Sequence, residues 1–302
     1  MPFRQVDIIG NGAIGNVLAY HLQHVKEIEH LARHVRTEAA TRFITLDGAE
    51  HSLATQLNVW PSDCSSHLVV IPVKSYQIIA ALAQFKQYFL ANTTLLLLHN
   101  GIIEPALLQD YEEQHRVFIA TTSIGAFKAT PSSCQQTGSG ATLVGSRQEV
   151  SRAEKDAITQ VLNHGLGPVE WTTNLKQTLW DKLAVNAIIN PLTALNNMRN
   201  GGLLAAEWQT MITALAQEIA SVMQAEGLKA SPQTISDKVR TIATLTQRNY
   251  SSMHQDIVFG RETEIEAING YLARRADSLG LSCPNNQRLL AEVTALSFDS
   301  RR

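Results

Sequence analysis

Apolar runs and helical patterns alternate along the first half of the chain. Short, largely apolar segments lie at residues 6–9, 67–71, 94–98 and 117–121. Runs of this length are typical of strands that are covered on both faces. Segments of helical character, such as residues 76–88, separate them, and a further strand is expected at residues 27–32. This alternation predicts βαβ units and a parallel sheet.

The alternating pattern ends in a polar stretch and one more helix. Residues 125–145 are rich in Ser, Thr, Gly and Gln, which predicts a hairpin or loop that closes the sheet. A capping box at residues 151–154 begins a helix that ends near residue 165. A short strand at residues 168–171 completes the region.

From Asn174 onward the pattern is helical and contains no convincing strand. A chain of 302 residues, 44% of them hydrophobic, can bury a substantial core, and its length favours two domains. We therefore predict an α/β domain at residues 1–170 and an all-helical domain at residues 171–302.

The turn after the first strand carries the G-x-G-x-x-G pattern. Gly10 allows a tight turn, Gly12 lets the backbone approach a pyrophosphate, and Gly15 lets the helix lie close to the sheet. The helix N-terminus then presents free amides to the phosphates. Three glycines in an ordinary strand-to-helix turn are the alternative. The residues predicted to bind a dinucleotide in a Rossmann-type domain are Gly10, Asn11, Gly12, Ala13, Ile14 and Gly15.

Three residues follow predicted strands, where ligands of open α/β sheets bind. Arg33 follows the second strand and suits a ribose 2′-phosphate, whereas an NAD site carries a carboxylate there. Glu29 lies too early in that strand to fill this role. The position of Arg33 therefore predicts that the cofactor is NADP(H). The alternative is that Arg33 is an ordinary surface charge. Lys74 and Asn100 follow two other strands and are placed where chemistry occurs.

Composition excludes several classes of partner. A net charge of −2 and scattered basic residues give no general attraction to nucleic acid or anionic lipid. No apolar run approaches the roughly 18 residues of a membrane span, and the first strand leaves no room for a cleavable leader. Cys64, Cys134 and Cys283 lack metal-ligand spacing, so we expect reduced structural thiols and no metal. A cytoplasmic protein that acts on small molecules is expected.

Polar residues recur at intervals of four within an apolar helix of the second domain: Lys182, Asn186 and Asn190. Steps of four advance about 40° around a helix, so these side chains form one stripe within reach of a single ligand. A lysine in so apolar a helix must pair with an acid or point into a polar cleft. Pro191 is expected to kink the helix. The alternative is a solvated stripe on an amphipathic helix.

A second polar cluster covers residues 249–256 and 260–270. Ser252 can donate to a carboxylate, and Glu264 can accept from a hydroxyl or pair with the lysine of the stripe. Spacing alone does not separate Glu264 from Glu262 or Glu266.

These motifs resemble the ketopantoate reductase family, NADPH-dependent enzymes that reduce 2-dehydropantoate to pantoate on the way to coenzyme A. The resemblance runs from the glycine turn through Lys74 and residues 99–101 to segments 182–194, 251–256 and 263–270. It implies a Rossmann-type domain, a helical domain like that of 6-phosphogluconate dehydrogenase-like proteins, and an active site between the two.

The resemblance also assigns roles. Lys182 is the general acid that protonates the ketone oxygen, and Glu264 hydrogen-bonds the substrate hydroxyl and the lysine. Asn186 and Asn190 contact the hydroxyl end, and Ser252 contacts the carboxylate. The further candidates are Asn249 and Asn100 for the substrate, Lys74 and Asn100 for the nicotinamide side, and Arg33 for the 2′-phosphate.

The resemblance fixes the type of reaction more closely than the substrate. A reductase of another short keto acid or 3-hydroxy acid, and a non-catalytic NADPH-binding sensor, are the alternatives. We expect a monomer or homodimer.

Overall fold

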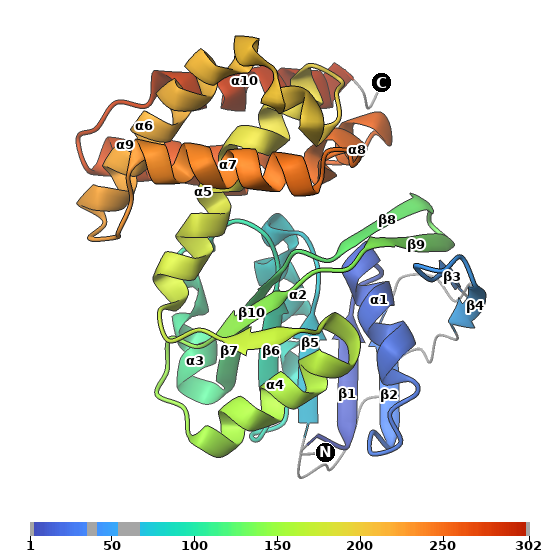
Figure 1. The fold of residues 1–302 in the computed structure, drawn as a ribbon. Helices are drawn as coiled ribbons and strands as arrows, with labels where there is room; N and C mark the ends of the chain where they lie inside the picture. The colour runs from blue at the N-terminus through green and yellow to red at the C-terminus, as the bar shows by residue number, and fades with distance from the viewer. Residues whose placement is uncertain (1–2, 35–40, 54–66, 300–302) are drawn as a thin grey trace. The chain divides into compact units, whose positions relative to one another are not determined.

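The computed structural model describes residues 3–34, 41–53 and 67–299. The chain forms two compact units (Figure 1). The first unit comprises Met1–His99 and Ile103–Leu175, and the second comprises Asn100–Ile102 and Lys176–Arg302.

The first unit is built on a seven-stranded sheet with the order β11-β10-β7-β6-β5-β1-β2. Its strands are β1 Gln5–Ile9, β2 His30–His34, β5 His67–Ile71, β6 Thr94–Leu98, β7 Arg116–Thr122, β10 Thr142–Gly145 and β11 Val169–Trp171. Neighbouring strands are parallel, except that β10 runs antiparallel to β7. The predicted parallel α/β sheet is therefore confirmed, with one antiparallel pair added.

The expected start of the second strand was wrong. The strand begins at His30 rather than at residue 27, because its pairing with β1 begins where Gln5 lies opposite His30. Glu27 and Glu29 are exposed residues before the strand, and Glu29 forms an ion pair of 3.4 Å with Arg4.

Helices cover both faces of this sheet (Figure 1). They are α1 Ala13–Leu22, α2 Ile78–Phe85, α3 Gln109–Gln114 and α4 Arg152–Leu166, with 3₁₀ turns η1 Ser75–Gln77, η2 Lys86–Tyr88 and η3 Pro105–Leu108. Ile8 of β1, Leu18 of α1 and Leu162 of α4 belong to one buried core. The predicted capping box begins α4, since Ser151 Oγ accepts from the Glu154 amide and Glu154 Oε2 accepts from the Ser151 amide at 2.7 Å.

A smaller sheet with the order β4-β3-β9-β8 packs beside α1. Its strands are β3 Thr41–Ile44, β4 Glu50–Leu53, β8 Gly125–Thr130 and β9 Ser133–Gly138. Phe43 stacks on Tyr20 of α1, with ring centroids 4.6 Å apart, and Tyr20 Oη lies 3.1 Å from His51 Nε2. The predicted hairpin is β8–β9, but β3 and β4 were not predicted.

A buried carboxylate lies within β1. Asp7 bonds His34 Nε2 at 2.6 Å, His67 Nε2 at 2.7 Å and Gln5 Nε2 at 3.0 Å. Burial by itself would raise the pKa of Asp7, but the hydrogen bonds from His34, His67 and Gln5 outweigh it and hold this pKa below its ordinary value.

Replacing this carboxylate is expected to destabilise the first unit. A depressed folded pKa means that the contribution of Asp7 to stability is present above its unfolded pKa of about 3.9 and is lost as the pH falls through the folded pKa. Asp7→Asn is expected to lower the free energy of unfolding at neutral pH by about 3 kcal/mol, because it removes one partner of a buried cluster. Urea unfolding at several pH values measures this difference, which should shrink in acid. Equal stability of Asp7→Asn and the exposed control Glu27→Gln would contradict it.

The second unit consists of helices and connecting loops, with no strand among its described residues. Its elements are α5 Leu175–Leu195, η4 Asn200–Leu204, η5 Ala206–Trp208, α6 Gln209–Ala225, α7 Pro232–Leu245, α8 Ser252–Val258, the π-helical turn η6 Glu266–Gly270, α9 Tyr271–Ser278 and α10 Pro284–Asp299. Trp180, Ile188 and Leu215 lie in its core. Pro191 does not end α5, which continues to Leu195, and the predicted kink stays a prediction. In the described ranges, none of the helices combines the length and apolarity needed to span a bilayer.

Candidate active site

The glycine turn between β1 and α1 is held in a conformation that requires glycine. Gly10 has a φ of +111°, and a Cβ atom added to it would lie 2.6 Å from Val73 Cγ1. A Cβ atom on Gly15 would lie 3.0 Å from Pro72 Cγ. The turn therefore packs against the residues that follow β5, at the carboxyl ends of the strands. Gly12 is the N-cap of α1 and has no side chain that could accept from the first amides of the helix. These amides can therefore donate to a phosphate group.

Asn11 is the centre of a hydrogen-bond network at this turn. Asn16 Nδ2 donates to Asn11 Oδ1 at 3.0 Å and to the Gly12 carbonyl at 2.7 Å. Arg33 Nη2 donates to Asn11 Oδ1 at 3.1 Å and to Asn16 Oδ1 at 2.6 Å. Lys128 Nζ, from β8, donates to the Asn11 carbonyl at 2.9 Å. Two cations from two different sheets thus contact one residue of the predicted cofactor turn.

Arg33 is a buried residue of β2 with unused donors. Its side chain reaches the glycine turn, and the residue is only 3% exposed, so the alternative of an ordinary surface charge is wrong. Among the described residues, its Nε and Nη1 atoms have no hydrogen-bond partner. Burial lowers the pKa of Arg33. Unpaired guanidinium donors beside a phosphate-type turn fit the 2′-phosphate of NADP(H), which would satisfy them by charge-assisted bonds.

Lys74 lies in the same unit and follows Val73, the residue that packs against Gly10. It is the N-cap of η1, where its amide donates to Gln77 Oε1 at 3.2 Å. It lies beyond the carboxyl end of β5, and its predicted place near the dinucleotide stays a prediction.

In the second unit, α5 carries the predicted polar stripe. Lys182 and Asn186 are half-buried and Asn190 is buried, whereas Leu183 and Ile188 of the same helix belong to the core. Burial lowers the pKa of Lys182 to about 8, and the nearby Glu264 carboxylate opposes that shift. The stripe is therefore not a solvated helix face.

Side-chain exposure distinguishes Glu264 from Glu262 and Glu266, which sequence spacing could not do. Glu264 is 4% exposed, whereas Glu262 and Glu266 are exposed. Asn100 Nδ2 donates to Glu264 Oε2 at 3.2 Å. A Cβ atom on Gly101, which has a φ of +72°, would lie 2.6 Å from the Ala267 carbonyl oxygen, so the chain at residues 100–102 packs closely on the turn after Glu264. Lys182, Glu264 and Asn100 thus form one group.

Ser252 is the first residue of α8 and Asn249 precedes this helix, and both are exposed. The neighbouring Ser251 is buried and caps the helix by accepting from the His254 amide at 3.2 Å. Its Oγ also accepts from Thr193 Oγ1 of α5 at 2.7 Å. Ser251 therefore joins the segment that carries Ser252 to the helix that carries the stripe.

Two domain descriptions match the chain: "Ketopantoate reductase PanE/ApbA" over residues 6–149 and "Ketopantoate reductase PanE/ApbA C terminal" over residues 174–297. A 2-dehydropantoate 2-reductase of Vibrio cholerae serotype O1 is 36% identical over 289 residues, which cover 96% of each chain. This chain belongs to the ketopantoate reductase family.

Solved structures agree with this assignment. A PanE/ApbA family ketopantoate reductase from Ralstonia eutropha JMP134 has a TM-score of 0.81 and 26% identity, covering 99% of this chain and 100% of that one. A D-mandelate dehydrogenase with NADH and anilino(oxo)acetate has a TM-score of 0.87 with 19% identity over 99% of this chain and 100% of that one, which shows a shared fold. The α/β unit followed by a helical unit is thus the fold of ketopantoate reductases.

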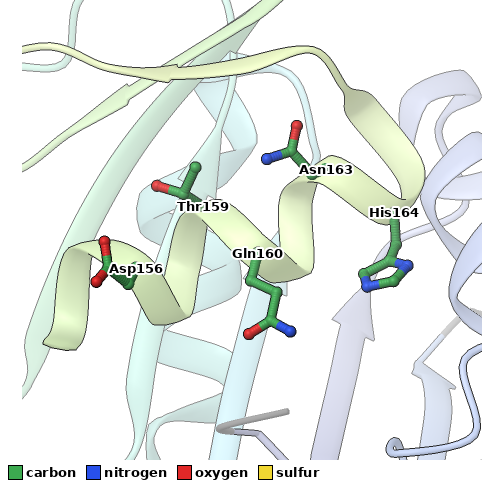
Figure 2. A pocket seen from close by; sticks show the side chains of 5 residues that line it. All are labelled: Asp156, Thr159, Gln160, Asn163 and His164. Atoms are coloured by element: carbon green, nitrogen blue, oxygen red, sulfur yellow. The ribbon is translucent and has the colours of Figure 1, made fainter.

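An open hollow of about 480 Å³ on α4 includes none of the predicted site residues (Figure 2). It is lined by Asp156, Thr159, Gln160, Asn163 and His164, which all lie on this one helix. Within the described ranges no group of three or more His, Cys, Asp or Glu is placed to hold a metal. Cys134 and Cys283 are buried free thiols whose pKa burial raises to about 12 and about 11, and Cys64 lies outside the described residues.

Sequence reasoning missed two residues of these networks. Asn16 follows the third glycine of the turn, where a polar residue facing the turn is a usable local signal. Lys128 carries no local signal, because its partner Asn11 is distant in the chain.

Proposed function

We propose that this chain reduces 2-dehydropantoate to (R)-pantoate with NADPH, as a step of pantothenate and coenzyme A biosynthesis. The observation that carries the proposal is the group formed by the buried Glu264 and the half-buried Lys182 and Asn100 in a member of the ketopantoate reductase family. When bound, NADPH supplies the hydride. The six turn residues, Arg33 and Lys74 would hold it in the first unit, and the second unit would hold the substrate. We assign cofactor binding to residues 1–170, apart from residues 100–102, which belong to the second unit, and substrate binding to residues 171–302 together with Asn100.

Lys182 acts as the general acid. With a pKa of about 8 it is largely protonated at neutral pH, yet close enough to neutrality to release its proton. Its ammonium group stabilises the negative charge that develops on the ketone oxygen and then protonates that oxygen. Glu264 keeps this pKa from falling further and orients the lysine, while Asn100 donates to Glu264 and holds it in place.

The substrate is a short keto acid that also carries a hydroxyl group. Asn186 and Asn190 offer amide donors and acceptors to the hydroxyl end, together with Glu264. Ser252 donates to the carboxylate, with Asn249 as a second donor nearby. A sensor that only binds NADPH has no use for a partly desolvated lysine beside a buried glutamate, so catalysis is the better explanation of this group.

The first test is NADPH oxidation at 340 nm with purified protein and 2-dehydropantoate, beside a series of other 2-keto acids. We expect kcat/KM to be highest for 2-dehydropantoate. A higher value for another keto acid would identify a different reductase. Binding of NADPH with no turnover on any of them would favour the sensor.

Glu264→Gln is expected to lower kcat/KM about tenfold. This is the smallest effect expected for the loss of a hydrogen bond to a charged group, which contributes about 1.5–3 kcal/mol. The substitution should also move the alkaline fall of activity to lower pH, because the carboxylate is the charge that raises the pKa of Lys182. A pH profile of kcat measures this shift. The exposed neighbour provides the matched control Glu262→Gln, for which the profile should not move. An unmoved profile in Glu264→Gln would remove the proposed pairing.

We also propose that the protein acts in the cytoplasm, as a monomer or homodimer, without nucleic-acid or membrane partners. The net charge of −2 supports this expectation. Sedimentation of the purified protein decides between monomer and dimer.

A further inference from the structure

Pro191 removes a hydrogen bond from the helix that carries the stripe. Because proline has no N–H group, the carbonyl of Ala187, four residues earlier in α5, has no helical donor. Asn269 takes this place, since its Nδ2 donates to the Ala187 carbonyl at 2.9 Å. Both residues are 0% exposed, so water does not substitute for this donor.

The orientation of Asn269 is fixed by a chain of polar groups that runs from the partly buried Glu218 through the buried Asn286. Glu218 of α6 can only accept, and Asn286 Nδ2 donates to its Oε2 at 2.7 Å. Asn286 Oδ1 is therefore left to accept from Asn269 Nδ2 at 3.1 Å. The amide group of Asn269 must then turn its donors toward both Asn286 and Ala187. Asn269 is thus the donor at both of its contacts: it donates to Asn286, which donates in turn to the Glu218 carboxylate, and it donates to the Ala187 carbonyl.

The bond from Asn269 to Ala187 joins two parts of the candidate site. Asn269 lies in the π-helical turn η6, which follows Glu264, and the amides of Ala267 and Ile268 each donate to the Glu264 carbonyl at 3.1 Å. Ala187 lies directly after Asn186. Insertions of π-helix are frequent at functional sites, because they redirect side chains within a helical segment.

We propose that Asn269 is a positioning residue for the reductase: it replaces the hydrogen bond that Pro191 removes and holds the α5 turn of Asn186 and Asn190 in register with Glu264. The inference rests on the proposed function for its kinetic consequence, whereas the bond itself stands on the structure. Asn269 contacts Ala187 and Asn286, and it acts on the substrate through the stripe.

Asn269→Ala in the full chain tests the proposal. We expect kcat/KM for 2-dehydropantoate to fall roughly tenfold or more, because small displacements of positioning groups reduce rates strongly. The KM for 2-dehydropantoate should rise, while the Kd of NADPH measured by calorimetry should stay unchanged, since the glycine turn belongs to the other unit. The control is Val239→Ala, a buried change in α7 that should lower stability and leave kcat and KM of the folded protein unchanged. Lower stability with unchanged kinetics in Asn269→Ala as well would overturn the proposal.

A second variant tests the pairing with Pro191. Pro191→Ala restores an N–H group four residues after Ala187, so the double variant Pro191→Ala/Asn269→Ala should recover most of the lost kcat/KM. Failure to recover would overturn the role assigned to the Ala187 bond. If the wild type does not reduce 2-dehydropantoate, the proposed function fails, and the same cycle measured by urea unfolding still decides on the bond. Additive effects of the two changes on unfolding would overturn it.

Discussion

Lys182→Ala is expected to lower kcat by about 10²–10⁴-fold, the range for loss of a general acid. The ketone oxygen would then acquire negative charge with neither an ammonium group nor a proton donor beside it. NADPH binding should survive, because the turn residues and Arg33 belong to the other unit. Stopped-flow measurement of single turnovers and calorimetry of NADPH binding separate the two effects.

The pH dependence identifies the lysine independently of the rate. A general acid must be protonated, so wild-type kcat should fall as the pH rises through about 8, where burial places the pKa of Lys182. Lys182→Ala should lack this fall. Lys176→Ala is the matched control on the same helix, because Lys176 is exposed and pairs with Glu226 at 2.9 Å. Normal turnover and an unchanged pH profile in Lys182→Ala would rule out the general acid.

Local patterns predicted the large sheet because each of its central strands is a short, self-contained apolar run. The residues of β5 and β6 are buried almost throughout, as their sequences require. The smaller sheet escaped prediction for the opposite reason. β3 and β4 have only four residues each, and β4 has a single buried position. β3 pairs with β9, about ninety residues later, at Phe43 and Cys134. Strands this short, paired with a distant segment, are too short to show a reliable local pattern.

The candidate site divides in the same way. The stripe on α5 follows from helical spacing alone, which places Lys182, Asn186 and Asn190 on one face. Spacing did not select Glu264, because exposure of a carboxylate in a loop depends on how the chain returns to the core. The role of Asn269 could not be predicted for a related reason, because its partner Ala187 is 82 residues away in the chain. Pro191 was the available signal, since a proline within a buried helix leaves a carbonyl that needs a distant donor.

Arg33→Ala is expected to lower the preference for NADPH over NADH about 100-fold. Hydrogen bonds to charged groups contribute about 1.5–3 kcal/mol, which is a factor of roughly 10–150 in affinity. The buried Nε and Nη1 atoms of Arg33 are the donors that a 2′-phosphate would use. NADH lacks that phosphate and should lose less. Calorimetric Kd values for NADPH, NADH and 2′-AMP measure the difference.

The ratio of the two affinities, rather than either one alone, carries the test. Arg33 also donates to Asn11 and Asn16, so its removal loosens the glycine turn and weakens both cofactors. Only the 2′-phosphate interaction distinguishes them. Arg33→Lys keeps a charge but loses the fork geometry, and should fall between wild type and Arg33→Ala. The exposed control Arg4→Ala should change neither affinity. Equal losses for NADPH and NADH in Arg33→Ala would mean that Arg33 only stabilises the glycine turn. The preference for NADPH would then depend on another cation. Lys128, which donates to the Asn11 carbonyl, is the next candidate.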